Sequence, residues 1–127
     1  MWKLRIALFG AICALSLWPV EIEPVARGRE VFENRCTGCH SLDSIKVGPP
    51  MRSVFGRRAA SYPGFPYSDS LKRVPLVWDE ASLEHWLADP EAVAPDNDMG
   101  FRLSQATERS AVIAYLRQLA AKRDPVR

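Results

Sequence analysis

The sequence predicts a single all-α domain with three main helices, short helical turns and long loops. Three stretches of the 127-residue chain place apolar side chains at helical spacing, one near each end of the domain and one between them. The segments 41–50, 57–78 and 90–106 are rich in Pro, Gly, Ser and Asp and lack the alternation typical of strands. A chain of this length is expected to build one hydrophobic core rather than several domains.

The first helix is predicted to run up to the first cysteine of the domain. Small and apolar residues recur there at helical spacing, namely Gly28, Val31, Phe32 and Cys36. A glycine on that face would let another helix cross closely, because it carries no side chain to hold the two backbones apart. After this helix, the stretch Met51–Phe55 before Gly56 is expected to form a short helical turn.

The middle helix is predicted to begin after Asp79, whose carboxylate can cap it, and to end at Pro90. Its apolar face consists of Leu83, Trp86 and Leu87. Thr107 is predicted to cap the last helix, which carries an apolar stripe made of Val112, Tyr115, Leu116 and Leu119. The first and last helices are expected to cross, because their apolar stripes have no other partner of matching length.

The first 20 residues predict an export signal. Lys3 and Arg5 form a short positive region, and 15 largely apolar residues, 6–20, follow it. That run is shorter than the about 20 residues that a helix needs to cross a bilayer, which favours a signal peptide over a membrane anchor. No clear cleavage site follows, so an uncleaved N-terminal anchor stays open. Residues 21–127 are assigned to the folded domain, and Cys13 to the apolar part of the signal.

The charge of the domain argues against nucleic-acid binding. The chain has 17 Lys and Arg against 15 Asp and Glu, and two of the basic residues lie in the export signal. The domain therefore carries no net charge, and the basic excess that binds phosphate backbones is missing.

The informative motif is Cys36-Thr37-Gly38-Cys39-His40. A Cys-x-x-Cys pair serves as a redox disulfide, as half of a zinc site or as a haem attachment site. A zinc site needs four ligands, and the domain offers only His85 beyond this motif. A thioredoxin-like site would lie among alternating strands and helices. The histidine after the second cysteine favours covalent haem, because two thiols three residues apart can reach the two vinyl groups while the imidazole turns onto the iron. A structural disulfide is the remaining alternative.

An iron held by His40 needs a ligand or an open position on its other face. The candidates are Met51, Met99 and His85. Met99 is chosen because it lies in a turn-rich loop, 95–101, that can bend a thioether inward. Met51 follows His40 too closely along the chain to reach the opposite face, and His85 belongs to the pattern of the middle helix.

A flat apolar cofactor would also account for the long loops. So much loop leaves a poor core for a domain of this size unless a large apolar group fills the middle.

With these motifs, the sequence resembles the class I cytochromes c, most closely the small soluble bacterial members, from about residue 27 to residue 119. In that family Gly-Pro follows the attachment motif, as Gly48-Pro49 does here, and the proline carbonyl accepts the proximal histidine's Nδ1 proton. The resemblance also implies that Arg57, Tyr67 and Trp78 contact the haem propionates. It implies a cytochrome c fold wrapped around one haem c, attached through Cys36 and Cys39.

Two departures from the family pattern concern the partner surface and the methionine ligand. The loop that carries Met99 is acidic, with Asp89, Glu91, Asp96 and Asp98, where family members that dock on acidic partners have lysines. Arg35 and Lys46 still supply positive charge on the histidine side, so a mixed docking face is expected. Trp86 occupies a position where the family often has a tyrosine under the methionine, and its indole N–H is free to point elsewhere.

The resemblance implies a monohaem one-electron carrier of the bacterial periplasm that transforms no substrate. Redox proteins are the expected partners of a monomer, and membrane contact is expected only if the N-terminal segment is uncleaved. Two alternatives remain open: a haem subunit of a dehydrogenase or sulfur-oxidising complex, and a gas-binding or peroxidatic haem protein.

Overall fold

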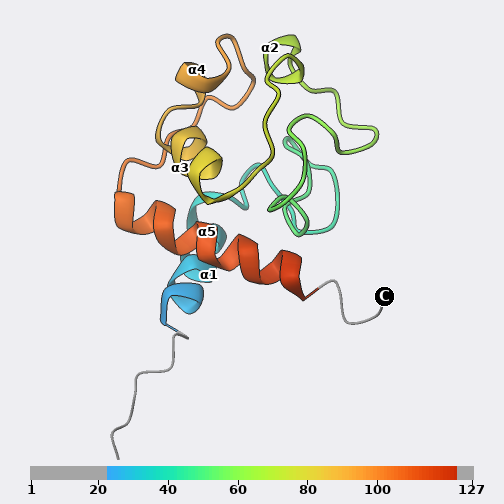
Figure 1. Cartoon of the computed structure of the whole chain (residues 1–127). Helices are drawn as coiled ribbons and strands as arrows, with labels where there is room; N and C mark the ends of the chain where they lie inside the picture. The colour runs from blue at the N-terminus through green and yellow to red at the C-terminus, as the bar shows by residue number, and fades with distance from the viewer. Residues whose placement is uncertain (1–22, 123–127) are drawn as a thin grey trace, which may run out of the picture.

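The computed structural model describes residues 23–122 and contains five helices in that range. They are α1 (Glu23–Arg35), α2 (Asp69–Lys72), α3 (Glu80–Ala88), α4 (Pro90–Val93) and α5 (Ala106–Ala121), as Figure 1 shows. The only strand-like pairing among these residues is one isolated bridge between Arg58 and Val77. The predicted all-α class is confirmed. The predicted export signal, residues 1–20, lies outside the described residues.

None of the helices within residues 23–122 is both long and apolar enough to cross a bilayer.

The crossing of the first and last helices is confirmed. Figure 1 shows α5 lying across α1, and the rings of Phe32 and Tyr115 meet with their centroids 5.8 Å apart. Gly28 lies at the point of closest approach, where a β-carbon would collide with the carbonyl oxygen of Ala111. The missing side chain of Gly28 is therefore what lets the two helix backbones touch.

Helix α3 begins as the sequence predicts. The Asp79 carboxylate accepts a hydrogen bond from Ser82 N, and Ser82 Oγ accepts one from Asp79 N, each at 2.8 Å. This reciprocal pair satisfies two of the donors left unpaired at a helix start. Pro90 ends α3 and opens α4, because proline is favoured in the first turn of a helix. Capping fixes the direction of α3, whose buried residues are Leu83, Trp86 and Leu87.

The predicted cap of α5 was wrong. The helix begins at Ala106, one residue before Thr107, and the capping position is held by Gln105, whose side chain makes no capping bond. Arg109, in the first turn, ties the helix to the segment before it: its Nη1 donates to the carbonyls of Leu103 and Ser104, each at 2.8 Å. Its Nε also donates to Glu84 of α3 at 2.6 Å. These bonds join the first turn of α5 to the loop before it and to α3, but a guanidinium only donates and does not cap the backbone N–H groups of the helix start.

The predicted loops contain two short helices that the sequence pattern missed. Helix α2 lies in segment 57–78 and α4 in segment 90–106, and each has four residues, too few to show a helical period. Ser68 caps α2 and Asp89 caps α4 with their side chains. The stretch 51–55, expected to form a short helical turn, forms hydrogen-bonded turns, with Val54 N donating to Met51 O at 3.2 Å.

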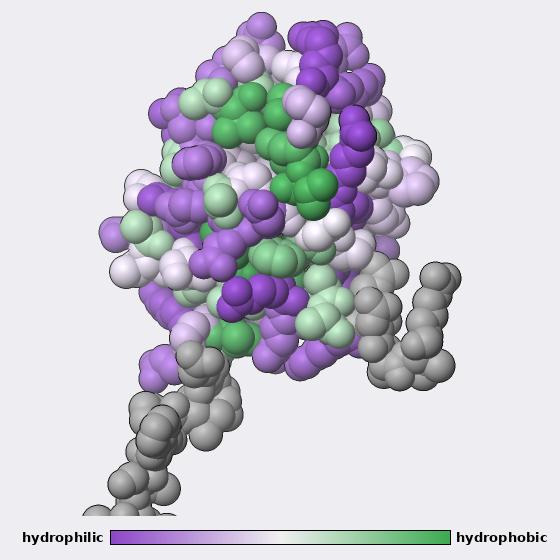
Figure 2. All heavy atoms as spheres, in the orientation of Figure 1, coloured by the Kyte–Doolittle hydropathy of each residue, from purple (hydrophilic) through white to green (hydrophobic). Residues whose placement is uncertain are grey.

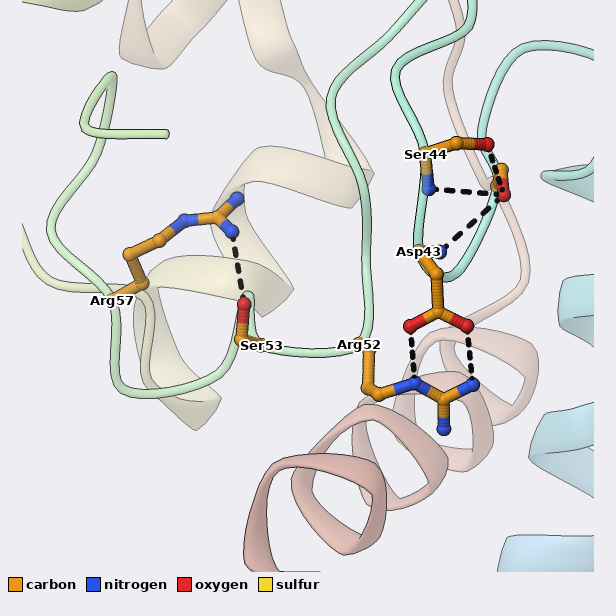
Figure 3. A network of polar contacts seen from close by, with 6 residues as sticks. Asp43, Ser44, Arg52, Ser53 and Arg57 are labelled. Atoms are coloured by element: carbon orange, nitrogen blue, oxygen red, sulfur yellow. Dashed lines mark hydrogen bonds and ion pairs between the residues drawn. The ribbon is translucent and has the colours of Figure 1, made fainter. Parts of the chain in front are cut away.

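Polar contacts between residues 41–43 and residues 51–52 hold together the two ends of the segment that follows the cysteine motif. In Figure 3 the Arg52 guanidinium donates two hydrogen bonds to the Asp43 carboxylate, at 2.5 and 2.7 Å. Backbone bonds run beside it, from Met51 N to Ser41 O and from Arg52 N to Leu42 O, both 3.0 Å. The two ends of this segment are thereby fixed, although it contains no helix.

Among the described residues, the large hydrophobic side chains are buried or partly buried except for three that are exposed. Val47 is 73% exposed, and Val77 and Ile45 are about half exposed. Figure 2 shows a face that is largely polar, with a run of hydrophobic residues near its upper part. The buried residues form one core cluster that extends from the α1–α5 crossing to α3.

Candidate functional site

The candidate site is a largely apolar cavity of about 400 Å³ enclosed by α1, α3, α5 and the loops. This volume falls within the range typical of small-molecule and cofactor sites, about 300–1,000 Å³. All eight residues predicted for the site line the cavity: Cys36, Cys39, His40, Pro49, Arg57, Tyr67, Trp78 and Met99. The fold therefore gathers residues from positions 36 to 99 around one space.

One wall of the cavity is the turn that follows α1. Cys39 N and His40 N both donate to the carbonyl oxygen of Cys36, at 3.1 and 2.9 Å. This turn carries the two thiols and the imidazole onto the same wall. Burial raises the pKa of the Cys36 thiol to about 11, and the neighbouring Cys39 adds to the increase. Cys36 is thus a neutral thiol at pH 7, whereas redox-active cysteines have lowered pKa values.

His40 is oriented by the segment after it. Its Nδ1 lies 2.9 Å from the carbonyl oxygen of Pro49, which only accepts, so the proton sits on Nδ1 and the Nε2 lone pair is left available. Gly48 packs against the ring so closely that a β-carbon there would overlap it. Burial lowers the pKa of His40, and the bond to Pro49 opposes this only in part. The expected contact between His40 and Pro49 is present.

Met99 comes from the loop after α4 and is held at two points. Its backbone N donates to Asn97 Oδ1 at 2.8 Å. Its sulfur lies 3.1 Å from Trp86 Nε1, which donates to it. The indole N–H therefore points at the methionine sulfur rather than elsewhere.

Asn97 is a site residue that the sequence reasoning missed. Its side-chain amide donates to Ala94 O at 3.0 Å and to the Glu91 carboxylate at 3.3 Å, and Glu91 also accepts from Asp96 N at 2.9 Å. An asparagine two residues before a methionine in a turn-rich loop is a recognisable signal, because Asn side chains bond backbone groups two residues on. Glu91 therefore has a structural role in this loop, while its exposed carboxylate keeps its negative charge.

The remaining predicted residues lie on the cavity wall with their own contacts. Arg57 donates to Ser53 Oγ at 3.3 Å, as Figure 3 shows, and its guanidinium lies 5.2 Å from the ring centre of Tyr62. Tyr67 Oη accepts from Tyr62 N at 3.2 Å. Trp78 is buried and meets Trp86 edge to face, with centroids 5.3 Å apart.

The other two candidates for the second iron ligand, Met51 and His85, differ in their position relative to the cavity. Met51 lines the cavity and is partly buried, whereas His85 is exposed on α3 and does not line it. The sequence holds only two histidines. The cavity therefore contains one imidazole, His40, and lacks a second histidine that could serve as a distal base.

This geometry does not favour the two alternatives for the cysteine pair, a zinc site and a thioredoxin-like redox site. Within residues 23–122 no three or more His, Cys, Asp or Glu side chains are grouped so that they could hold a metal ion, whereas a structural zinc site needs four ligands. The alternating strands and helices of a thioredoxin-like site are also missing from the described part of the chain. Two thiols, an oriented imidazole and a thioether around an apolar cavity suit a haem c group.

Five exposed residues line the mouth of the cavity: Arg35, Cys39, Val47, Asp98 and Gly100. The Arg35 guanidinium lies 3.9 Å from the Glu108 carboxylate. Beside the mouth, the ammonium of Lys46 donates to Thr37 O at 2.5 Å. The mouth therefore combines one positive charge, one negative charge and a large exposed apolar side chain.

Comparison with known proteins gives consistent matches. A family model described as cytochrome c matches residues 25–120. Cytochrome c2 of Rhodomicrobium vannielii is 38% identical over 120 residues, covering 91% of this chain and 95% of its own. Cytochrome c2 iso-2 of Magnetospirillum fulvum is 44% identical over 87 residues, covering 66% of this chain and 91% of its own. The structure of cytochrome cH from Methylobacterium extorquens superposes with a TM-score of 0.70 at 36% identity, covering 74% of this chain and 97% of its own.

Proposed function

The chain belongs to the cytochrome c family, whose members carry covalently attached haem c, and from that premise we propose that this monohaem electron carrier uses His40 and Met99 as axial ligands. We further propose that it works in the bacterial periplasm as a monomer between redox protein partners. It is not an enzyme, as its cytochrome c2 relatives are electron carriers. Residues 1–20 would direct its export.

The observation that carries the ligand assignment is the arrangement of His40 and Met99 around one apolar cavity. Each side chain is fixed by one hydrogen bond: His40 Nδ1 donates to Pro49 O, and Met99 Sδ accepts from Trp86 Nε1. In both cases a lone pair, on His40 Nε2 and on Met99 Sδ, is left available for a metal. Such bonds orient a ligand and tune its donation to a metal. His and Met together are the ligand pair of cytochromes c.

Cys36 and Cys39 would hold the group in place. Each thiol would form one thioether, and the turn that places both thiols beside His40 would set the distance from these anchors to the iron. The haem iron supplies the one-electron Fe(III)/Fe(II) couple. The protein contributes the apolar wall, which keeps water from the iron, and two ligands that stay bound in both oxidation states.

Arg57, Tyr67 and Trp78 are proposed donors to the haem propionates. Buried carboxylates are costly unless they are paired or hydrogen-bonded. A guanidinium, a phenol and an indole all present N–H or O–H groups, and all three line the cavity.

The partner surface is proposed to be the cavity mouth. The mixed charge there favours a partner with a largely neutral, apolar contact patch and an acidic group for Arg35 or Lys46.

Charges at a docking face act mainly on the association rate, through fields screened over about 8–10 Å. Stopped-flow measurements should show a lower association rate for Arg35→Glu and Lys46→Glu and little dependence on salt for the wild type. Lys122→Glu is the control and should leave the rate unchanged, because Lys122 lies at the C-terminal end of α5 and does not line the cavity. A steep salt dependence that none of these reversals alters would place docking elsewhere.

Optical spectra of the oxidised holoprotein test the ligand assignment. Met99→Ala should abolish the weak iron–sulfur absorption band near the red edge of the spectrum. Met51→Ala is the matched control, because it removes the other thioether that lines the cavity, and the band should persist. Survival of the band in Met99→Ala would refute the assignment.

A further inference from the structure

The methionine loop, residues 89–102, is closed at its base. The Asp89 carboxylate, where the loop begins, pairs with the Arg102 guanidinium at 2.7 Å. One residue further on, Leu103 N donates to Leu87 O at 2.8 Å. The chain therefore leaves the end of α3 and returns to the same place, which is the arrangement of a compact Ω-loop.

A single carboxylate ties the interior of this loop together. Glu91 Oε1 accepts from Asp96 N at 2.9 Å, and Glu91 Oε2 accepts from the side-chain amide of Asn97 at 3.3 Å. The two oxygens of one group thus bind two separate N–H donors, and an ionised carboxylate suits this arrangement because it only accepts. Glu91 thereby joins the short helix α4 to the turn just before Met99.

The turn that Glu91 holds has a backbone conformation that needs support. Asp96 has a φ of +61°, in the left-handed region that is uncommon for residues other than glycine. Such a conformation persists when the surrounding structure holds it, and the bond to Asp96 N comes from Glu91. Asn97 passes the restraint on, because its Oδ1 accepts from Met99 N at 2.8 Å.

We propose that Glu91 is a positioning residue that keeps the methionine loop closed, so that Met99 stays on the iron and small molecules are kept off it. This inference rests on the proposed ligand role of Met99. Glu91 is exposed and does not line the cavity, so it contacts neither the iron site nor the sulfur. It acts on the ligand through Asp96 and Asn97, which fix the backbone of Met99.

The closed loop bears on the choice between an electron carrier and a haem protein that binds small molecules. An iron with an open coordination position can bind gases or peroxide, whereas an iron with two bound protein ligands serves electron transfer. The loop must open before Met99 can leave the iron. Weakening the bonds made by Glu91 should therefore raise the affinity of the iron for an added ligand, while Met99 stays bound when no such ligand is present.

Imidazole binding to the oxidised holoprotein measures how readily the loop opens, since imidazole must displace Met99 from the iron. Glu91→Gln keeps the shape of the side chain, but its NH₂ group faces an N–H donor whichever way the amide turns. Its affinity for imidazole should rise about three- to tenfold, because hydrogen bonds to a charged group are lost. Glu30→Gln is the matched control: it removes the same charge from the exposed face of α1 and should leave the affinity unchanged.

A double-mutant cycle tests whether Glu91 acts through Asn97. Asn97→Ala removes the acceptor for Met99 N and one of the two donors to Glu91. Glu91→Gln should therefore raise the affinity for imidazole less in the Asn97→Ala background than in the wild type. Hydrogen exchange gives a readout that does not depend on the iron: the backbone amide of Asp96 should exchange faster in Glu91→Gln than in the wild type.

The outcomes distinguish this inference from the ligand assignment. If Met99→Ala retains the iron–sulfur band, the ligand assignment itself fails. If Met99→Ala loses the band while Glu91→Gln binds imidazole as the wild type does, Met99 is the ligand and the role of Glu91 is refuted. An equal rise in affinity for Glu30→Gln would assign the effect to net charge and would also refute it. So would an equal effect of Glu91→Gln in both backgrounds, or unchanged exchange of the Asp96 amide.

Discussion

Replacing Gly28 by alanine should destabilise the protein, although alanine is the better helix former. In the middle of a helix the exchange of Gly for Ala is worth about 0.5–1 kcal/mol of added stability. At Gly28 the new β-carbon would collide with the carbonyl oxygen of Ala111 and lie 2.8 Å from the β-carbon of Tyr115. Backbone atoms of α5 cannot turn aside as a flexible side chain can, so the two helices must separate.

The separation of the helices should lower the free energy of unfolding by more than the higher helix propensity of alanine raises it. Overpacking a well-packed core costs typically about 1–3 kcal/mol, and the rigid backbone neighbour places Gly28→Ala near the upper end. After the propensity gain, the net loss is about 2 kcal/mol of unfolding free energy. For a domain of about 100 residues, this lowers the melting temperature by about 8–15 °C.

Thermal unfolding of the holoprotein, followed by circular dichroism, measures this effect. Ala26→Gly is the matched control, because Ala26 is exposed two residues earlier in the same helix and reports the propensity difference alone. The control should be destabilised by no more than about 1 kcal/mol. If Gly28→Ala melts at or above the wild-type temperature, the close crossing of α1 and α5 is not what requires a glycine.

Three further predictions concern packing, pH and assembly. Phe32→Ala should cost about 3–5 kcal/mol in denaturant unfolding, because Phe32 is 3% exposed at the helix crossing; a cost below 1 kcal/mol would contradict that packing. Hydrogen bonds from Ser82 lower the pKa of Asp79, so this cap stabilises α3 above the ordinary aspartate pKa and is lost as the pH falls through the lowered value. Melting curves from pH 7 to pH 2 should show Asp79→Ala less stable than the wild type at neutral pH and equal to it in acid; a gap that persists in acid would argue against the cap. Gly48→Ala should lower the yield of haem-loaded protein, because the added methyl would overlap the ring of His40; normal yield and an unchanged spectrum would show that the ring can move.

The features that could be predicted from the sequence are those that depend on neighbours along the chain. The spacing of Cys36, Cys39 and His40 is set by one turn of backbone, so the motif alone indicated covalent haem, which the family match confirms. Capping by Asp79 and the apolar stripes of α1, α3 and α5 are equally local. Helices α2 and α4 were missed because their four residues make little more than one turn, which leaves no repeating pattern to detect.

The tertiary structure decided what depends on residues far apart in the chain. Helix α5 begins one residue before Thr107 without a side-chain cap, and Arg109 in its first turn bonds Glu84, 25 residues away, a contact that no local pattern predicts. Trp86 and Met99 are 13 residues apart, and only the packing of α3 against the following loop aims the indole N–H at the sulfur. Backbone geometry fixes distances within one turn, so a sequence determines them directly. Distances between residues on opposite sides of a cavity are set by how whole helices pack, and that packing depends on every side chain between the helices.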